Sequence, residues 1–483
     1  MENFSRLQGQ TGAALLITLI ALVIFSILGL FMTLSATTDL NISDNYESQL
    51  QATYAAIAGL NHARALLRGL PFDDPLKGPD GAYDKGTTYM AYAKGYAFRS
   101  PLPLLTGQSL NILDPSSDVS GFPDNGLINT GFYESANGTE LIPLTGISMV
   151  APNPYGLGSI LTSRYFVKVS DNNGDTAEIA GDSQDNPFVD GDGTIIVRSM
   201  GIARTMSEVT GLVRRLNSVA VFEARFRRLS TWNLGPALTI LGDGVTAAFS
   251  GSYEISGGLS PGIGTIDTVP GDTIFLDQII RAAAGGSGSV SGAGQPNPSV
   301  QEIAGQVQSN PDQSLLLDPR YLWDFIHSQS PKWADIFFDG SQNWLSGVPY
   351  VGSYDSAKPP NAPGQDPKIT VVNGDLQVSD GFSGGGLLIV TGDFSCSGSY
   401  AYSGLVLVIG SGNLTASGSG QGIEGGLVAA KLVDVSGTYV FGAPSLSIGN
   451  SSRFTSNKDV VKMAIALIPA AQISFREIAG SDP

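Results

Sequence analysis

The sequence is short of the residues on which most catalytic and metal sites depend. Its 483 residues include one cysteine, Cys396, and two histidines, His62 and His327. A single cysteine excludes an intrachain disulfide and a multi-cysteine zinc site, and two histidines exclude a three-histidine zinc site. There is no GxxxxGK[ST] phosphate loop, and the two GxSxG matches, at Gly258 and Gly381, lie in glycine-rich turns. The commonest enzyme templates are therefore excluded.

Charge is scarce and mostly of one sign. Charged residues make up 14% of the chain, and the net charge is −17. Such a chain repels nucleic acid and anionic lipid headgroups, so we expect no nucleic-acid partner. Hydrophobic residues make up 42% and glycines number 61, which gives enough apolar surface for a core and many tight turns. The composition indicates a folded, β-rich, extracytoplasmic protein.

A long uncharged run lies near the N-terminus. Residues 13–34 read AALLITLIALVIFSILGLFMTL, and as a helix they span ~33 Å, enough to cross a ~30 Å hydrocarbon layer. Arg6 favours a cytoplasmic N-terminus, which would leave the rest outside. Apolar residues then recur at helical spacing until Gly69 and Pro71 supply a stop. We expect one helix over residues 13–70, single-pass in the inner membrane, with an amphipathic half that packs on an extracytoplasmic head.

Two segments of this helix carry a family resemblance. The runs TGAALLITLIALVIFSILGL and YAAIAGLNHARALL resemble the N-terminal segment of the PilX-type minor pilin-like proteins of type IV pili. The resemblance implies that residues 1–12 are a leader, that a prepilin peptidase cuts between Gly12 and Ala13, and that the new amine is methylated. It also implies other pilins and minor pilins and the inner-membrane assembly machinery as partners.

The fifth mature position in this scheme is Ile17, where major pilins carry a glutamate. In those filaments the carboxylate neutralises the terminal amine of a neighbouring subunit in an apolar setting, where an unpaired charge costs several kcal/mol. A subunit with Ile17 has no such carboxylate, which suits a filament tip or an initiating complex. A plain membrane anchor and a cleaved ordinary signal sequence are the alternatives.

Residues 71–235 are expected to form a loop-rich, pilin-like head. RYFVKVSDNNGD, GTIIVRSMGIAR and SEVTGLVRRLNSVAVFEARFRR alternate as strands do, which predicts an antiparallel sheet packed on the helix. Aspartates between the first two strands resemble an oxygen-ligand calcium loop, although Thr176 stands where an EF-hand has glycine. Solvated turns are the alternative to a structural calcium site. The candidate ligands are Asp171, Asn173, Asp175, Asp190 and Asp192.

The C-terminal half repeats a short apolar strand. GLLIVTG at Gly386, GLVLVIG at Gly404 and GLVAAKL at Gly426 are separated by glycine- and serine-rich turns. This spacing predicts a parallel β-solenoid over residues 236–258 and 368–450, with an antiparallel β-sandwich as the alternative. Residues 259–367 are predicted to be a helical insertion and residues 451–483 a cap. Trp323, Trp333 and Trp344 are expected to form a small core in the insertion rather than a sugar-binding platform.

Other candidate chemistry is sparse. Asp375, Asp380 and Asp393 lie on neighbouring expected rungs, as a carboxylate pair of a glycan-cleaving enzyme would, but NGD and TGD are also ordinary turns. Cys396 shares a strand face with Phe394, which predicts a buried thiol. His62 is expected on the polar face of the helix, and His327 in helix packing. We therefore expect no enzyme and no cofactor apart from the candidate calcium.

The sequence thus predicts an α+β protein with a long N-terminal helix, a pilin-like antiparallel sheet and a C-terminal β-rich domain. Its expected function is that of a minor pilin-like structural protein of a type IV pilus or related secretion filament. The acidic head would be displayed on the pilus or cell surface, at the tip in particular. A membrane-anchored β-solenoid adhesin or polysaccharide-binding protein outside any filament is the alternative, and the ligand would then be a surface or a carbohydrate.

Overall fold

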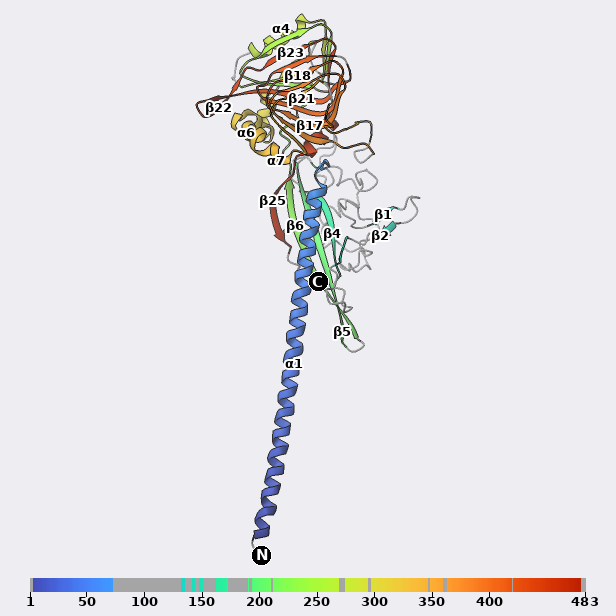
Figure 1. Cartoon of the computed structure of the whole chain (residues 1–483), viewed down its shortest axis with the longest axis vertical. Helices are drawn as coiled ribbons and strands as arrows, with labels where there is room; N and C mark the ends of the chain where they lie inside the picture. Colours follow the sequence, from blue (N-terminus) through green and yellow to red (C-terminus); the bar gives the residue numbers. More distant parts are fainter. Residues whose placement is uncertain are drawn as a thin grey trace.

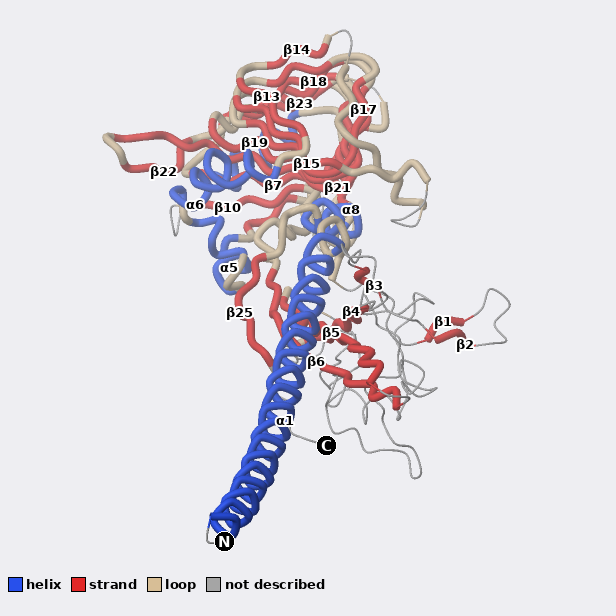
Figure 2. The backbone as a smooth tube through the Cα atoms, turned by 60° about the horizontal axis from the view of Figure 1, so that its bottom comes forward, coloured by secondary structure: helices blue, strands red, loops and turns tan. Residues whose placement is uncertain are grey.

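A single long helix carries a head of two β-structured parts (Figure 1). The computed structural model describes residues 3–72, 132–134, 141–143, 147–150, 162–172, 190, 193–209, 212–268, 274–293, 297–345, 348–358, 363–418 and 420–478. An antiparallel sheet lies beside the last part of the helix, and a β-rich region with two parallel sheets lies beyond the end of the helix (Figure 2). The expected α+β class is confirmed.

The N-terminal helix α1 covers Asn3–Leu66 without a break. The expected long helix is therefore present, and it ends slightly earlier than residue 70. The chain leaves the helix through a turn at Gly69, whose φ of 86° lies in the left-handed region that favours glycine. Among the described helices α1 alone is long and apolar enough to cross a membrane.

The antiparallel sheet has five strands in the order β25-β6-β5-β4-β3. Their bounds are β3 Ile147–Val150, β4 Thr162–Asp171, β5 Thr194–Val209, β6 Leu212–Arg227 and β25 Ala471–Glu477. A separate pair consists of β1 Phe132–Glu134 and β2 Leu141–Pro143. The predicted antiparallel sheet against the helix is confirmed, since β4, β5 and β6 all contact α1.

Small residues bring α1 and this sheet into close contact. Ala52, Ala56 and Ala63 on the helix are fully buried against sheet residues such as Val167 and Val197. Gly201 in β5 lies against the helix backbone, where an added Cβ would overlap the carbonyl oxygen of Ala52. The alanine and glycine content of this interface therefore sets the short distance between the two elements.

The β-rich region contains a twelve-stranded and a six-stranded sheet. The larger comprises β7 Leu238–Gly242, β9 Tyr253–Ser256, β10 Ile263–Asp267, β11 Ser289–Ser291, β12 Val300–Glu302, β13 Ile336–Asp339, β15 Lys368–Asn373, β17 Phe382–Val390, β19 Tyr400–Gly410, β21 Gly422–Val435, β22 Thr438–Gly442 and β24 Ser452–Ser456. The smaller comprises β8 Thr246–Ser250, β14 Gln342–Trp344, β16 Leu376–Val378, β18 Phe394–Ser397, β20 Leu414–Ser417 and β23 Ser445–Gly449. All pairings in both sheets are parallel except the β21–β22 hairpin.

The larger sheet is buried on both faces, which explains its continuous apolar runs. In β17, Leu388 and Val390 face the six-stranded sheet, whereas Leu387 and Ile389 belong to a second core under the helices. The strands of the smaller sheet alternate instead, with one face in the core and one in solvent. β16 and β20 show this buried–exposed–buried pattern.

Stacked glycines fix the register between successive strands of the larger sheet. Gly386 pairs with Gly404 as the sequence spacing suggests, but Gly404 pairs with Gly425 and not with Gly426. An added Cβ on Gly404 would overlap the oxygen of Gly386, and one on Gly425 would overlap the oxygen of Gly404. The stacked residues are therefore Gly386, Gly404 and Gly425, the glycines at which the backbones of neighbouring strands approach most closely.

The region between residues 259 and 367 is only partly helical. Its helical elements are α4 Ile274–Gly285, α5 Ala304–Ser309, η2 Gln313–Leu317, α6 Pro319–Asp324, η3 Phe325–Gln329 and α7 Ser330–Trp333. Strands β10 to β14 in the same region continue the parallel sheets. The structure thus differs from the expected helical insertion. The sequence did not reveal these strands, because strands of three to five residues are too short to show a period.

The C-terminal segment divides between the two parts of the head. Helix α8, Lys458–Ala466, packs on β17, β19 and β21 of the larger parallel sheet. β25 instead returns to the antiparallel sheet and pairs with β6. The segment expected to cap the β-rich region therefore only partly does so, and the whole β-rich region lies in the chain between two adjacent strands of the antiparallel sheet.

Candidate functional site: the N-terminal helix and its junction with the head

The first half of α1 is an apolar surface with nothing packed on it in the described chain. Side chains from Ala14 to Ser43 are exposed apart from half-buried Ala21. Leu15, Phe25 and Met32 are each more than 70% exposed. Water disfavours such a surface by ~25 cal/mol for each Å² of apolar area. A lipid bilayer or other apolar helices would remove this cost.

Five hydroxyl side chains in this half donate hydrogen bonds within the helix. Thr18 donates to the Leu15 carbonyl, Ser26 to that of Leu22 and Thr38 to that of Leu34, each at 2.8 Å. Thr33 and Thr37 donate to carbonyls three or four residues earlier in the same way. No water is needed to satisfy these hydroxyls, so the segment is compatible with hydrocarbon.

The expected processing site lies at the start of this surface. Gly12 and Ala13 are both within α1, and Ile17, the fifth position after Gly12, is 65% exposed. The described chain therefore places no group of its own on Ile17.

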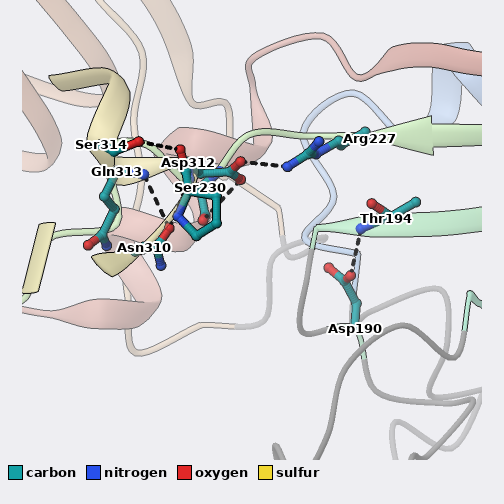
Figure 3. A network of polar contacts seen from close by, with 9 residues as sticks. Asp190, Thr194, Arg227, Ser230, Asn310, Asp312, Gln313 and Ser314 are labelled. Carbon is teal, nitrogen blue, oxygen red and sulfur yellow. Dashed lines mark hydrogen bonds and ion pairs between the residues drawn. The ribbon is translucent and has the colours of Figure 1, made fainter. Parts of the chain in front are cut away.

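The candidate calcium ligands are only partly described. Asp171 is the last residue of β4, and Asp190 lies before β5, where its Oδ1 accepts a hydrogen bond from the Thr194 amide at 3.0 Å (Figure 3). Asn173, Asp175 and Asp192 lie outside the described residues. Among the described residues, no group of three histidine, cysteine, aspartate or glutamate side chains is placed to hold a metal ion.

Arg228 closes the junction between α1 and the head. Its guanidinium is almost fully buried and donates to the carbonyl oxygens of Leu67, Leu70 and Ile468 at 2.7 to 3.2 Å. Burial lowers the pKa of Arg228 to about 10, although the nearby Asp190 carboxylate acts in the opposite direction. The side chain therefore remains charged at neutral pH and complements the negative end of the helix dipole.

Two further ion pairs tie the same junction together. Arg227 Nη2 lies 2.7 Å from Asp312 Oδ1, and the other oxygen of Asp312 accepts from the Ser230 amide at 3.0 Å (Figure 3). Arg68 at the end of α1 lies 2.9 Å from Asp335 and also donates to the Trp333 carbonyl. These contacts link the end of α1 and the end of β6 to the β-rich region.

A buried glutamate holds the returning strand. Glu223 in β6 is 1% exposed and pairs with Arg198 of β5 at 2.6 Å and with Arg476 of β25 at 2.7 Å. Burial by itself raises the pKa of Glu223, but the hydrogen bonds and charges of Arg198 and Arg476 outweigh it and leave the pKa below its ordinary value.

The sequence alone did not predict that these arginines form the junction between α1 and the head. The run RFRRLS, which holds Arg225, Arg227 and Arg228, ends an apolar strand and looks like a solvated edge. A cluster of arginines directly after a buried strand is the one signal that could have suggested a buried guanidinium.

The aspartates considered for catalysis occupy stacked turns. Asp375 Oδ1 accepts from the Asp393 amide at 2.9 Å, and Asp393 Oδ1 accepts from the Asn413 side chain at 2.8 Å. Asp380 accepts from the Ser399 amide of the next turn. Cys396 is fully buried, and burial raises the pKa of its thiol to about 12.

The histidines and tryptophans contribute to packing. His62 Nδ1 lies 3.0 Å from the Tyr165 hydroxyl at the helix–sheet interface. Trp323 stacks on His327 at 3.7 Å and on Tyr439 at 4.3 Å between ring centroids. At these distances the rings of His327 and Tyr439 must lie on opposite faces of the indole. Trp323 therefore has no open face for a sugar ring. Burial lowers the pKa of His327, partly offset by its hydrogen bond to the Trp323 carbonyl.

The chain was compared with protein families, curated proteins and solved structures. No family model matches it, no curated protein matches it, and no solved structure matches it. The geometry of α1 and its junction is therefore what bears on function.

Proposed function

We propose that this chain is a minor pilin-like structural subunit of a type IV pilus or a related secretion filament. Residues 13–34 anchor it in the inner membrane before assembly, with the N-terminus cytoplasmic, and the acidic head is displayed outside. Its partners are other pilins and minor pilins, the prepilin peptidase and the inner-membrane assembly machinery.

One observation carries the proposal. A single 64-residue helix combines an apolar half with no cover from its own described chain and a second half packed on an antiparallel sheet. A plain anchor needs only the first half and a flexible link. A rigid continuation into the head instead fixes the head relative to the apolar half, which is useful where helices of many subunits pack together.

We also infer that the two parallel sheets form one β-solenoid. Consecutive strands alternate between the sheets, as β15 to β20 do, and each pairs in parallel with the strand two places later. The side chains between the sheets form one continuous core. These are the features of a chain that winds in rungs, each of which is covered by the next.

The missing carboxylate at Ile17 favours a position at the filament tip. A glutamate there would be paired inside the filament body but would lack a neighbouring amine at the tip, where it would stay protonated or cost roughly a few kcal/mol in lipid. The tip subunit therefore gains nothing from a carboxylate, and few copies are expected per filament.

The test is the amount of this protein in sheared filaments from cells that carry Ile17→Glu. We expect the wild-type protein in the filament fraction at a low ratio to the major subunit, and no increase with Ile17→Glu. Leu16→Glu is the matched control, because Leu16 is similarly exposed at 61% but lies off the fifth position.

Quantitative immunoblotting measures the ratio. A clear rise with Ile17→Glu but not with Leu16→Glu would contradict the tip position. Absence of the wild-type protein from every filament preparation, with the protein intact in the membrane, would contradict the filament role and favour the membrane-anchored adhesin.

A further inference from the structure

The edge strand β25 is joined to the head along one side only, by its antiparallel pairing with β6. All seven of its residues, Ala471–Glu477, are exposed. The register of its pairing with β6 shifts between Gln472 and Ser474, which interrupts the ladder. β25 therefore buries little apolar area, and the side-chain contacts that supplement its backbone ladder lie near its C-terminal end.

Three contacts near the C-terminal end of β25 add to its backbone ladder with β6. Phe475 stacks on Phe222 of β6 at 5.1 Å between ring centroids. Arg476 pairs with Glu223, and the Ile478 amide donates to the Val221 carbonyl at 2.8 Å. Phe475 is half-exposed and the Arg476 side chain is 64% exposed, so on the β25 side both contacts are open to solvent, whereas their β6 partners Phe222 and Glu223 are buried.

The rest of the antiparallel sheet does not depend on β25. β5 and β6 pair continuously from Thr194–Arg227 to Val209–Leu212. Glu223 keeps its bond to Arg198 if Arg476 leaves, so no buried charge is left unpaired. The sheet side of the core against α1 is supplied by β4, β5 and β6, of which Phe222 alone loses a stacked ring when Phe475 leaves.

We propose that β25 is a detachable strap: it opens from β6 as a unit while α1, β3–β6 and the parallel sheets stay folded. In the closed state the strap is one of two chain connections between the antiparallel sheet and the β-rich region. In the open state the connection after β6, the contacts of Arg228, Arg227 and Arg68, and the hydrogen bond from the Gly69 amide to the Ala466 carbonyl still hold the region near the helix. The strap thus sets how firmly the head is fixed on α1.

Hydrogen exchange of the full chain in detergent, followed by mass spectrometry, tests this proposal. Local opening predicts that amides of β25 exchange at least about tenfold faster than those of β5. It also predicts that this exchange does not respond to low denaturant, since local opening exposes little surface. Arg476→Ala is expected to speed exchange in β25 by a further several-fold and to leave β5 unchanged.

Two further variants make the experiment decisive. Arg453→Ala removes an exposed arginine pair on β24, 3.3 Å from Glu254, and is expected to leave β25 exchange unchanged. Ala224→Cys with Phe475→Cys places two cysteines opposite one another in the register, within the ~4.4–6.8 Å Cα range of a disulfide. Oxidation of this pair is expected to abolish the fast exchange and reduction to restore it.

The proposal would be overturned by two results. One is exchange of β25 at the rate of β5, with the same denaturant dependence, since β25 would then open only with the whole sheet. The other is fast β25 exchange that persists in the oxidised double-cysteine variant, since the exchange would then not require detachment of the strand.

Discussion

Glu223 is the residue at which burial and charge are most closely balanced. It is 1% exposed, yet two arginines keep it ionised, and one of them belongs to a strand more than 250 positions away in the chain. A buried charge is stable only while it is paired, so this carboxylate depends on partners that the sequence does not connect.

Glu223→Gln tests that balance through pH. Because the folded pKa of Glu223 lies below its ordinary value, the charged form stabilises the fold above pH ~4.5, and this stabilisation is lost as pH falls through the folded pKa. At pH 7 we expect the variant to be less stable by about 1–3 kcal/mol. The deficit should shrink toward pH 3, as measured by thermal unfolding in detergent.

Glu254→Gln is the control for this experiment, because Glu254 pairs with Arg453 at an exposed site. It is expected to change stability by less than about 1 kcal/mol at any pH. A Glu223→Gln deficit that stays constant from pH 7 to pH 3 would show that the charge of Glu223 does not stabilise the fold.

At the scale of elements, the close contact between α1 and β5 is the most specific feature. The helix backbone approaches the sheet so closely that Gly201 has no room for a side chain. The contact was expected from the amphipathic pattern of the helix, but its closeness was not, because the alanines and glycines that permit it are common in any helix or turn.

Gly201→Ala tests this contact. The added methyl would meet the backbone of Ala52 and Ala56, which cannot move aside as a side chain can. We expect a loss of roughly 1–3 kcal/mol in stability, with the helix displaced from the sheet.

Gly285→Ala is the matched control, since Gly285 ends α4 and an added Cβ there would meet open space. It should be neutral or slightly stabilising by circular dichroism melting. Equal melting temperatures for the two variants would mean that α1 is held less closely than the geometry indicates.

The sequence predicted the elements with strong periods and missed those without. The long helix, β4, β5 and the parallel strands near Gly386 and Gly404 all have enough residues to show their pattern. The strands β11, β12 and β14, of three residues each, do not. The return of β25 to β6 is a long-range pairing that local patterns cannot encode.

In the candidate site, too, local features could be predicted from the sequence and long-range contacts could not. The apolar run and Ile17 are local features and were identified from the sequence. Arg228 and the pair between Arg68 and Asp335 were not, because their partners lie more than 150 positions away in the chain.

At the scale of the whole molecule, the apolar half of α1 and the head are separate in space (Figure 1). Residues 14–38 carry much of the exposed apolar surface but lie outside the core that α1 forms with the sheet. A fragment that begins at Asp39 is therefore expected to stay soluble without detergent and to give a β-rich circular dichroism spectrum. The full chain serves as the control and should require detergent. Precipitation of the fragment, or a mainly helical spectrum, would contradict this division.

The filament account depends most directly on processing of the N-terminus. Mass spectrometry of the N-terminal peptide of the membrane-extracted protein measures it. The account predicts a mature protein that begins at methylated Ala13, and a Gly12→Val variant that remains uncut. A mature protein that retains Met1 would contradict the account, and so would one that begins beyond Leu34, where an ordinary signal sequence would have been removed.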